Sequence, residues 1–170
     1  QLNYLTTVPR LYYHLTEEYS KETNNFVLKH KVAGKYVGIT YDQFKEETDS
    51  FAFGLASLGI GKGDKVSIIA ENRPEWVYSD MAVLGLGAID VPLYPSLTSD
   101  SVEYILNNSE SKAIIVSTKF QLNKVMKIRD KCKTLKFIIL LNEKDADASI
   151  KDLLSFGKVQ ELGKDFSKAH

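Results

Sequence analysis

Four short apolar runs recur along the chain, and a segment with helical spacing separates each run from the next. The runs occupy residues 66–70, 89–94, 113–117 and 137–141. Strands that are apolar on both faces are typical of a buried parallel sheet. Strands that alternate with helices predict an α/β fold, a doubly wound and mostly parallel sheet with flanking helices.

The first of these helices has clear start and stop signals. Thr40 and Gln43 have the spacing of a capping box, in which each side chain binds a free backbone amide. Gly59 suits the end of the helix, because glycine adopts the left-handed conformation without strain. The expected apolar stripe between them is Phe44, Thr48, Phe51, Leu55 and Leu58.

The second helix is expected to begin at Pro74, with Asn72 and Glu75 as its caps. Its inward stripe is predicted to be Val77, Met81, Leu84 and Ala88. The strand that follows contains Pro92, which cannot donate a ladder hydrogen bond. That strand is therefore expected at an edge of the sheet or at a bulge.

The later elements repeat the pattern. We expect a helix at 100–108, a second capping box at Thr118 and Gln121, and a helix at 119–132. The polar segment 142–149 is expected to be a loop, and a short helix is expected at 150–155.

The N-terminal part is interpreted as an appendage to the sheet. A helix is expected at 8–20, followed by strands at 26–31 and 35–39 that Ala33 and Gly34 join into a hairpin. The chain then divides into 1–39, this helix and β-hairpin; 40–142, the α/β core; and 143–170, a loop and a short helix.

Composition limits the classes of partner. The chain has 170 residues, 44% of them hydrophobic, with 22 basic and 22 acidic side chains. Balanced charge argues against a nucleic-acid partner. The single cysteine, Cys132, excludes an internal disulfide, and its helical spacing favours packing over catalysis. The three histidines are scattered, so no metal-ligand spacing appears, and no apolar run approaches the length of a membrane span.

Ligands of such sheets bind beyond the carboxyl ends of the strands. This places candidate residues at 71–73, 94–96 and 117–119. Arg73 could hold a phosphate or carboxylate there, but we favour an ion pair with Glu75 that positions the turn. Trp76 could form the wall of an acyl pocket, although packing in the core is the better interpretation.

Two other patterns are interpreted as structural. The glycine clusters at 59–63 and 85–87 end helices and precede strands, the reverse of a dinucleotide-binding fingerprint, so we expect turn glycines. The adjacent acids at 17–18 and 46–47 do not face each other on a helix and are expected on solvated faces.

The stretch 40–118 resembles the adenylate-forming ligases, which include acyl-CoA synthetases, luciferases and the adenylation domains of peptide synthetases. The order and spacing of several segments carry the resemblance. They are Thr40-Tyr41, Leu58-Gly59-Ile60, Gly63-Asp64-Lys65-Val66, Glu71-Asn72-Arg73-Pro74-Glu75-Trp76, Gly87-Ala88, Val91-Pro92-Leu93-Tyr94-Pro95 and Tyr104-Ile105-Leu106.

The long-chain fatty acid branch of that family is the most similar. Asn-Arg-Pro-Glu-Trp at 72–76 looks like that branch, and so do the segments at 121–125 and 135–136. The run Ser149-Ile150-Lys151-Asp152-Leu153-Leu154 also resembles it, so the resemblance spans nearly the whole chain.

The resemblance implies an ATP-dependent long-chain fatty acid–CoA ligase with ATP, Mg²⁺ and CoA as cofactors. The family's phosphate loop, its adenine- and ribose-binding motifs and its catalytic lysine do not occur in this sequence. No catalytic, cofactor-binding or metal residue is therefore assigned: none of these sites is expected here. We expect this chain to be the first portion of the large N-terminal domain, inactive alone and without bound cofactor.

Two alternatives stay open. The chain could be a free-standing α/β ligand-binding or regulatory module, or belong to a ligase for an aryl or medium-chain acid. The expected partners are the remainder of the same enzyme, fatty acid, ATP and CoA, with no nucleic acid. We also expect a homodimer formed through Trp76, Tyr94 or their neighbours, a cytoplasmic location and peripheral membrane contact.

Overall fold

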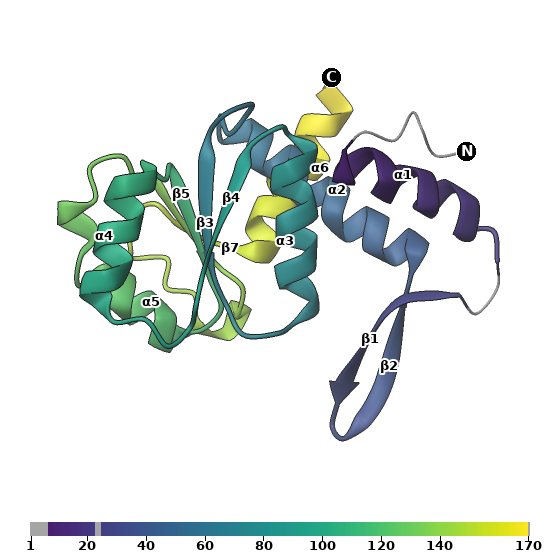
Figure 1. Ribbon diagram of the computed structural model, residues 1–170, viewed down its shortest axis with the longest axis horizontal. Coiled ribbons are helices and arrows are strands. Elements are labelled where there is room, and N and C mark those ends of the chain that lie inside the picture. The colour runs from purple at the N-terminus through teal and green to yellow at the C-terminus, as the bar shows by residue number, and fades with distance from the viewer. Residues whose placement is uncertain (1–6, 23–24, 170) are drawn as a thin grey trace.

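The computed structural model describes residues 7–22 and 25–169. Its centre is a five-stranded parallel sheet with strand order β4-β3-β5-β6-β7 (Figure 1). The strands are β3 (Lys65–Ile69), β4 (Ile89–Leu93), β5 (Ala113–Val116), β6 (Phe137–Leu140) and β7 (Leu153–Ser155). The four predicted strands are confirmed. β4 lies at one edge of the sheet, as Pro92 indicates.

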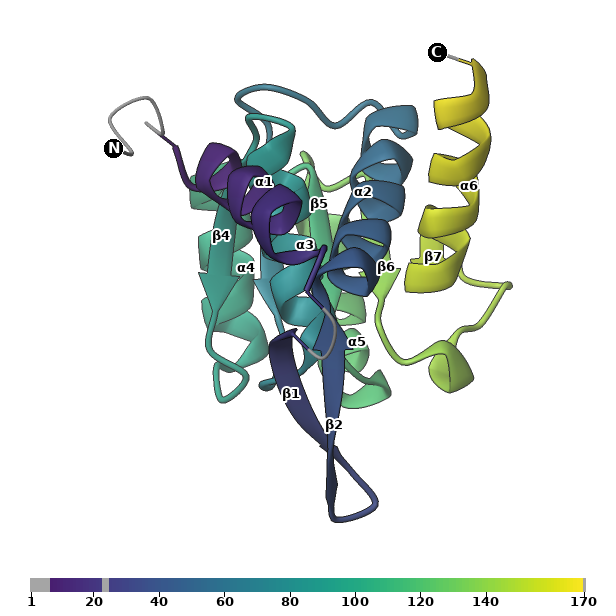
Figure 2. The ribbon, with the colours of Figure 1, turned by 90° about the vertical axis from the view of Figure 1, so that its right-hand side faces the viewer.

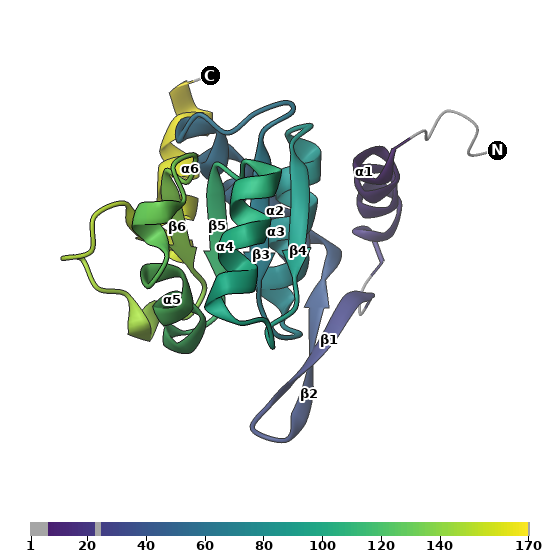
Figure 3. The ribbon, with the colours of Figure 1, turned by 60° about the vertical axis from the view of Figure 1, so that its left-hand side comes forward.

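Helices cover both faces of the sheet, as the doubly wound pattern predicts (Figures 1 and 3). One face packs against α2 (Tyr41–Ser57), α3 (Pro74–Gly85) and α6 (Phe156–Ala169), and the other against α4 (Ser99–Ser109) and α5 (Lys119–Met126). Alternate strand residues divide between these layers. Ile68 and Ile115 face the first layer and Ile69 and Ile114 the second, and all four are fully buried.

Thr40 and Gln43 form the predicted capping box. The Gln43 backbone amide donates to the Thr40 hydroxyl at 3.2 Å, and the Thr40 amide donates to Gln43 Oε1 at 3.0 Å. Gly59 follows the end of α2 with a φ of +78°. The start and the end of α2 are therefore confirmed.

The caps predicted for α3 are wrong, and the predicted inward face is right only in part: Ala88, just beyond the helix, is buried, and Val77 and Met81 pack against the core. The N-cap is Arg73, whose side chain makes no capping hydrogen bond, and Asn72 is exposed. The residues that α3 buries are Tyr78, Ser79, Ala82 and Val83, while Val77, Met81 and Leu84 are only partly buried. The helix is turned because it also packs on α2, where the ring centroids of Tyr78 and Phe44 lie 5.2 Å apart.

The C-terminal region differs most from the prediction. The short helix expected at 150–155 is wrong, because Leu153–Ser155 is strand β7, paired parallel to β6. The unpredicted helix α6 follows and packs along α2 (Figure 2). The helix expected at 119–132 ends at Met126, and a 3-10 turn follows at Arg129–Lys131. A second turn, Glu143–Asp145, interrupts the expected loop.

The N-terminal elements occur as predicted. Helix α1 (Val8–Tyr19) packs on α2, and strands β1 (Phe26–Val32) and β2 (Lys35–Thr40) form a separate antiparallel hairpin. Ala33 and Gly34 both have positive φ, as a tight two-residue hairpin turn requires. The hairpin extends away from the sheet and its helices (Figure 2).

Candidate functional site

The carboxyl ends of β3 and β5 lie side by side at the point where the strand order reverses. β3 pairs with β4 on one side and with β5 on the other. Helix α3, which follows β3, and helix α5, which follows β5, lie on opposite faces of the sheet (Figure 3). Open α/β sheets bind ligands at such a switch point. The residues predicted at 71–73 and 117–119 therefore meet at one place.

Arg73 forms a bidentate ion pair with Glu75. Its Nε and Nη2 donate to the two carboxylate oxygens of Glu75, each at 2.8 Å, and its Nη1 donates to the carbonyl oxygen of Ser117 at 3.4 Å. The interpretation of Arg73 as a residue that positions the turn is confirmed. It ties the end of β3 to the end of β5.

The ion pair changes the acidity of Glu75. Partial burial favours the neutral carboxyl group, but the hydrogen bonds from Arg73, a backbone hydrogen bond and the positive charge of Arg73 together outweigh that effect and lower the pKa of Glu75. Glu75 is therefore a carboxylate near neutral pH. It serves as the partner of Arg73 and is not suited to donate a proton.

Gln121 connects all three loops at this edge. Its side-chain nitrogen donates to Glu71 Oε1 at 3.0 Å and to the Pro95 carbonyl oxygen at 3.2 Å. The second capping box is therefore wrong in part. Thr118 does accept the Gln121 backbone amide at 3.5 Å, but the Gln121 side chain binds the loops after β3 and β4.

Glu71 interacts with both Gln121 and Ser117. Burial raises the pKa of Glu71, but hydrogen bonds from Ser117 and Gln121 reverse that effect and lower it overall. Gln121 Oε1 is buried and has no hydrogen-bond partner within the described part of the chain. The candidate site thus has a buried polar atom that a polar ligand could satisfy.

Lys124 holds the loop after β4 from the same helix. Its Nζ donates to the carbonyl oxygens of Pro95 and Leu97 at 2.7 and 2.8 Å, and lies 4.7 Å from the centroid of the Phe120 ring. Tyr94, at the start of this loop, is 78% exposed, whereas Trp76 is only partly buried and packs against the core. The expectation that Trp76 packs is confirmed.

The sequence did not reveal that Gln121 and Lys124 bind the neighbouring loops at this edge of the sheet. A polar side chain at 121, next to the buried Leu122 and one turn before the buried Val125, was the available signal. A glutamine on the inward face of a helix needs polar partners. Those partners come from distant loops, so the sequence alone does not identify them.

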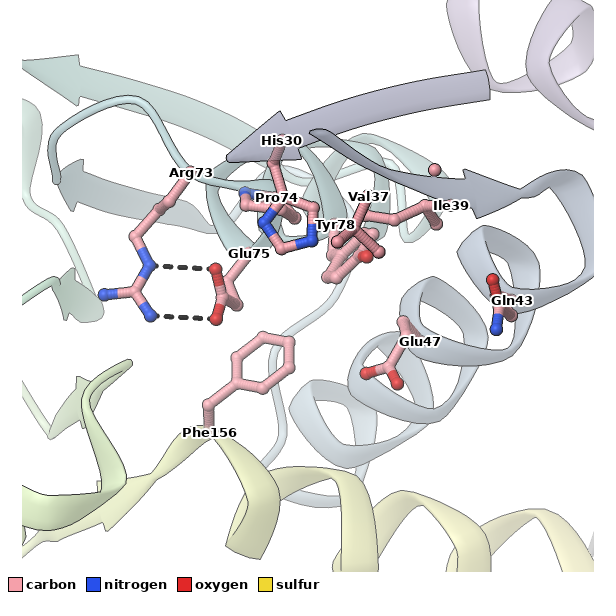
Figure 4. Close-up of a pocket in the computed structure, with 11 residues that line it drawn as sticks. His30, Val37, Ile39, Gln43, Glu47, Arg73, Pro74, Glu75, Tyr78 and Phe156 are labelled. Carbon is pink, nitrogen blue, oxygen red and sulfur yellow. Dashed lines mark hydrogen bonds and ion pairs between the residues drawn. The ribbon is translucent and has the colours of Figure 1, made fainter. Parts of the chain in front are cut away.

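Two hollows flank the hairpin, each of about 570 Å³. Figure 4 shows the first, where Val37 and Ile39 of β2 lie opposite Phe156 of α6. His30 of β1 and Glu47 of α2 also line it. The second is bounded by Leu28, Lys29, His30, Lys31 and Tyr36 of the hairpin and by Asn72, Arg73, Pro74, Trp76 and Val77. These hollows lie beside the turn that Arg73 organises.

The glycine clusters lie at the opposite end of the sheet, before β3 and β4. Gly59, Gly63 and Gly87 have positive φ, and the Gly63 amide donates to the Gly87 carbonyl oxygen at 3.0 Å. Their interpretation as turn glycines is confirmed, because no helix begins at either cluster.

An acidic pair that the sequence did not indicate joins α3 to β4. Burial, together with the charge of Asp90 and a hydrogen bond to it, raises the pKa of Asp80 to about 7. Of the adjacent acids considered earlier, Glu17, Glu18 and Glu46 are exposed. Glu47 is partly buried and accepts a hydrogen bond from Gln160 at 2.6 Å, so for Glu47 the solvated-face prediction is wrong.

Other classes of site have little support in residues 7–22 and 25–169. They contain no group of three His, Cys, Asp or Glu side chains that could hold a metal ion. Cys132 is buried, and burial raises the pKa of its thiol, so it is a poor nucleophile. None of the helices in these ranges is long and apolar enough to cross a membrane.

Known proteins with similar sequences are acyl-CoA ligases by name. Fatty acyl-CoA synthetase A of Dictyostelium discoideum is 37% identical over 51% of this chain and 13% of its own length. Long chain acyl-CoA synthetase 8 of Arabidopsis thaliana is 28% identical over 90% of the chain and 23% of its own length. The Drosophila melanogaster long-chain-fatty-acid–CoA ligase heimdall is 28% identical over 80% of this chain and 20% of its own length. The chain thus spans less than a quarter of each relative.

Solved structures with this fold include ligases for other acids. The coronafacic acid ligase of Pectobacterium brasiliense superposes with a TM-score of 0.74 at 23% identity, covering 88% of this chain and 28% of that protein. The anthranilate CoA ligase AuaEII superposes with a TM-score of 0.73 at 24% identity, covering 88% of this chain and 27% of that protein. At these identities the likeness supports the fold alone.

The family assignment combines the sheet, the switch-point turn and the sequence match. The sequence pattern of the family described as "AMP-binding enzyme" matches residues 15–162, which include every strand of the parallel sheet. This chain belongs to the AMP-binding, adenylate-forming enzyme family.

Proposed function

We propose that this chain is the opening scaffold of an ATP-dependent ligase that joins a long-chain fatty acid to CoA. The proposal depends mainly on sequence similarity. The chain matches proteins from a slime mould, an insect and a plant that are named as fatty acyl-CoA or long-chain acyl-CoA ligases. The family membership supports the use of ATP.

The proposed reaction has two steps. A carboxylate oxygen of the fatty acid attacks the α-phosphorus of ATP, forming the acyl-adenylate and releasing pyrophosphate. The CoA thiol then attacks the acyl carbon, forming the thioester and releasing AMP. The described residues offer no cluster of metal ligands, so we assign no step to Mg²⁺ through this chain.

The structure supports a scaffolding role for the switch-point residues. Arg73 and Glu75 neutralise each other, and Gln121 and Lys124 donate to backbone carbonyls and to Glu71. Transition-state stabilisation needs preorganised donors aimed at the reacting group. These donors are directed at the protein's own loops, so we assign the chemical step to other parts of the ligase.

A chain-length series on the full-length gene product tests the proposal. We expect palmitate to give the highest kcat/KM for CoA-dependent pyrophosphate release, at least about tenfold above octanoate and benzoate, because each buried methylene adds binding energy. Highest activity with benzoate would support an aryl-acid ligase, as the structural neighbours suggest. A coding sequence that ends at His170 would support a free-standing module instead.

The proposed setting follows from the substrate. We place the enzyme in the cytoplasm, with peripheral membrane contact where it meets an apolar acid, and as a homodimer through the exposed Tyr94 (78% exposed). Sedimentation of the wild-type protein and of Tyr94→Ser at high concentration tests the dimer. Equal sedimentation of the two proteins would show that Tyr94 does not contribute to a dimer interface.

A further inference from the structure

The β1–β2 hairpin is a two-stranded sheet that is separate from the central sheet. Its base is anchored: Ile39 is buried, and Val27 and Leu28 pack against the core. Residues 31–37, which form its outer half, are all exposed. A two-stranded hairpin is marginally stable in water without a third strand or a packed face.

The outer half exposes apolar side chains. Tyr36 is 70% exposed, Val32 49% and Val37 44%. Val32 and Val37 lie on one face of the hairpin, and Tyr36 lies on the other, where Lys31 Nζ is 5.3 Å from its ring centroid. Single exposed apolar residues are ordinary, but these belong to a projecting strand pair beside two hollows. This combination indicates a surface that another segment covers.

The register identifies the backbone groups that are free to pair. Val32 is paired with Lys35 next to the two-residue turn, and His30 with Val37. These residues direct their backbone groups inward in an antiparallel ladder, and the alternate residues direct theirs outward. The outward groups belong to Lys29 and Lys31 on β1, and to Tyr36 and Gly38 on β2.

The two edges differ in charge. β1 carries Lys29 and Lys31, and lysines on an edge strand oppose pairing with another strand. β2 carries Lys35 beside the turn, but its residues 36–40 carry no charge. The first hollow lies against Val37, Gly38 and Ile39 (Figure 4). The β2 edge therefore has both unpaired backbone and space beside it.

We infer that the β2 edge, at Tyr36–Gly38, pairs with an extended segment of the same ligase outside these 170 residues, which fills the hollow beside Val37. The relatives are more than four times as long as the part that matches, so such a segment is available in proteins of this family. The inference rests on the proposed function, because it requires a longer ligase.

Amide hydrogen exchange tests the pairing directly. The Tyr36 and Gly38 amides are expected to exchange at least about a hundredfold more slowly in the full-length protein than in the 170-residue chain, and the Lys29 and Lys31 amides equally fast in both. Equal rates for Tyr36 and Gly38 would overturn the inference. Their protection in the 170-residue chain at high concentration would identify a second copy as the occupant and also overturn it.

Paired substitutions give a second test. Val37→Asp places a charge at the hollow, and Val32→Asp places one on the same hairpin outside both hollows. In the 170-residue chain both should shift Tm by less than about 2 °C, because both side chains are exposed. In the full-length protein only Val37→Asp should lower Tm, by more than about 5 °C. Equal shifts would contradict the inference.

Ligase turnover in the same preparation separates the two proposals. An active full-length enzyme whose Tyr36 and Gly38 amides are unprotected would keep the proposed function and reject the pairing. A protein with protected amides that activates no acid would reject the proposed function and keep the covered edge.

Discussion

Gly54 of α2 and Gly163 of α6 lie at the point where the two helices approach most closely. A Cβ atom added at Gly163 would lie 2.6 Å from the Gly54 amide nitrogen and would overlap the Ser50 carbonyl oxygen. One at Gly54 would overlap the Val159 carbonyl oxygen. The two backbones touch only because both side chains are hydrogen, and this contact joins the C-terminal helix to the first face of the sheet.

Substitution of Gly163 by alanine should separate these helices. We expect Gly163→Ala to lower the free energy of unfolding by about 2–3 kcal/mol, because an added methyl group has no space. Gly85→Ala is the control: Gly85 is also a helical residue, the last of α3, but has no atom within 4 Å of an added Cβ. It should be neutral or stabilising by up to about 1 kcal/mol. Similar effects of both in urea unfolding would contradict the close contact.

Much of this arrangement could be predicted from the sequence, and the exceptions have physical causes. Long apolar strands and capping residues such as Thr40 act locally, so their positions were predictable. Strand β7 has three residues, and the buried face of α6 includes Gly163 with Phe156 and Val159. A glycine contact leaves no apolar periodicity in the sequence. The C-terminal strand and helix were therefore missed.

The candidate site was predictable in position but not in detail. The βα alternation fixes where the strand ends meet, and the Arg73–Glu75 pair follows from two neighbouring opposite charges. The contacts of Gln121 with Glu71 and Pro95 join residues far apart in sequence. Local capping rules assigned the Gln121 side chain to Thr118, and the tertiary fold redirected it.

Gln121 should contribute measurably to stability. Replacing it with leucine removes the donor to Glu71 and Pro95 in a buried position, so we expect Gln121→Leu to cost about 2 kcal/mol. Asn123→Leu, on the exposed face of the same helix, should change stability by less than about 0.5 kcal/mol. Chemical denaturation compares the two, and an equally small effect of both would show that the loops do not depend on Gln121.

The ion pair between Arg73 and Glu75 should show a pH-dependent coupling. The pKa of Glu75 is lower in the folded protein than in the unfolded chain. The ion pair therefore stabilises the folded protein fully when the pH is above the unfolded pKa of about 4. This stabilisation is lost as the pH falls through the folded pKa of Glu75. A double-mutant cycle with Arg73→Met and Glu75→Gln should give a coupling of about 1 kcal/mol near neutral pH, which decreases as the pH falls below about 4. Coupling that persists in acid would contradict the ion pair.

Asp80 should make the protein less stable as pH rises. Its pKa is raised to about 7 by burial and by Asp90, so the folded state holds a proton that the unfolded chain releases above about pH 4. The free energy of unfolding therefore falls between about pH 4 and pH 7.

Asp80→Asn imitates the protonated carboxyl group. It should raise the free energy of unfolding by about 1 kcal/mol at about pH 8, since the side chain is only partly buried and solvent reduces the effect. It should give no gain near pH 4, where the wild-type carboxyl group is largely protonated in the folded state. Asp130→Asn, at an exposed position, serves as the control. A gain that is the same at both pH values would exclude the shared proton.

Titration of Mg²⁺-ATP into the 170-residue chain, followed by calorimetry, tests the central claim most directly. The account assigns this chain the folded scaffold and places the nucleotide-binding groups in other parts of the ligase. It predicts no heat of binding to the folded chain alone, together with saturable binding to the full-length protein. Micromolar affinity of the 170-residue chain for Mg²⁺-ATP would contradict it.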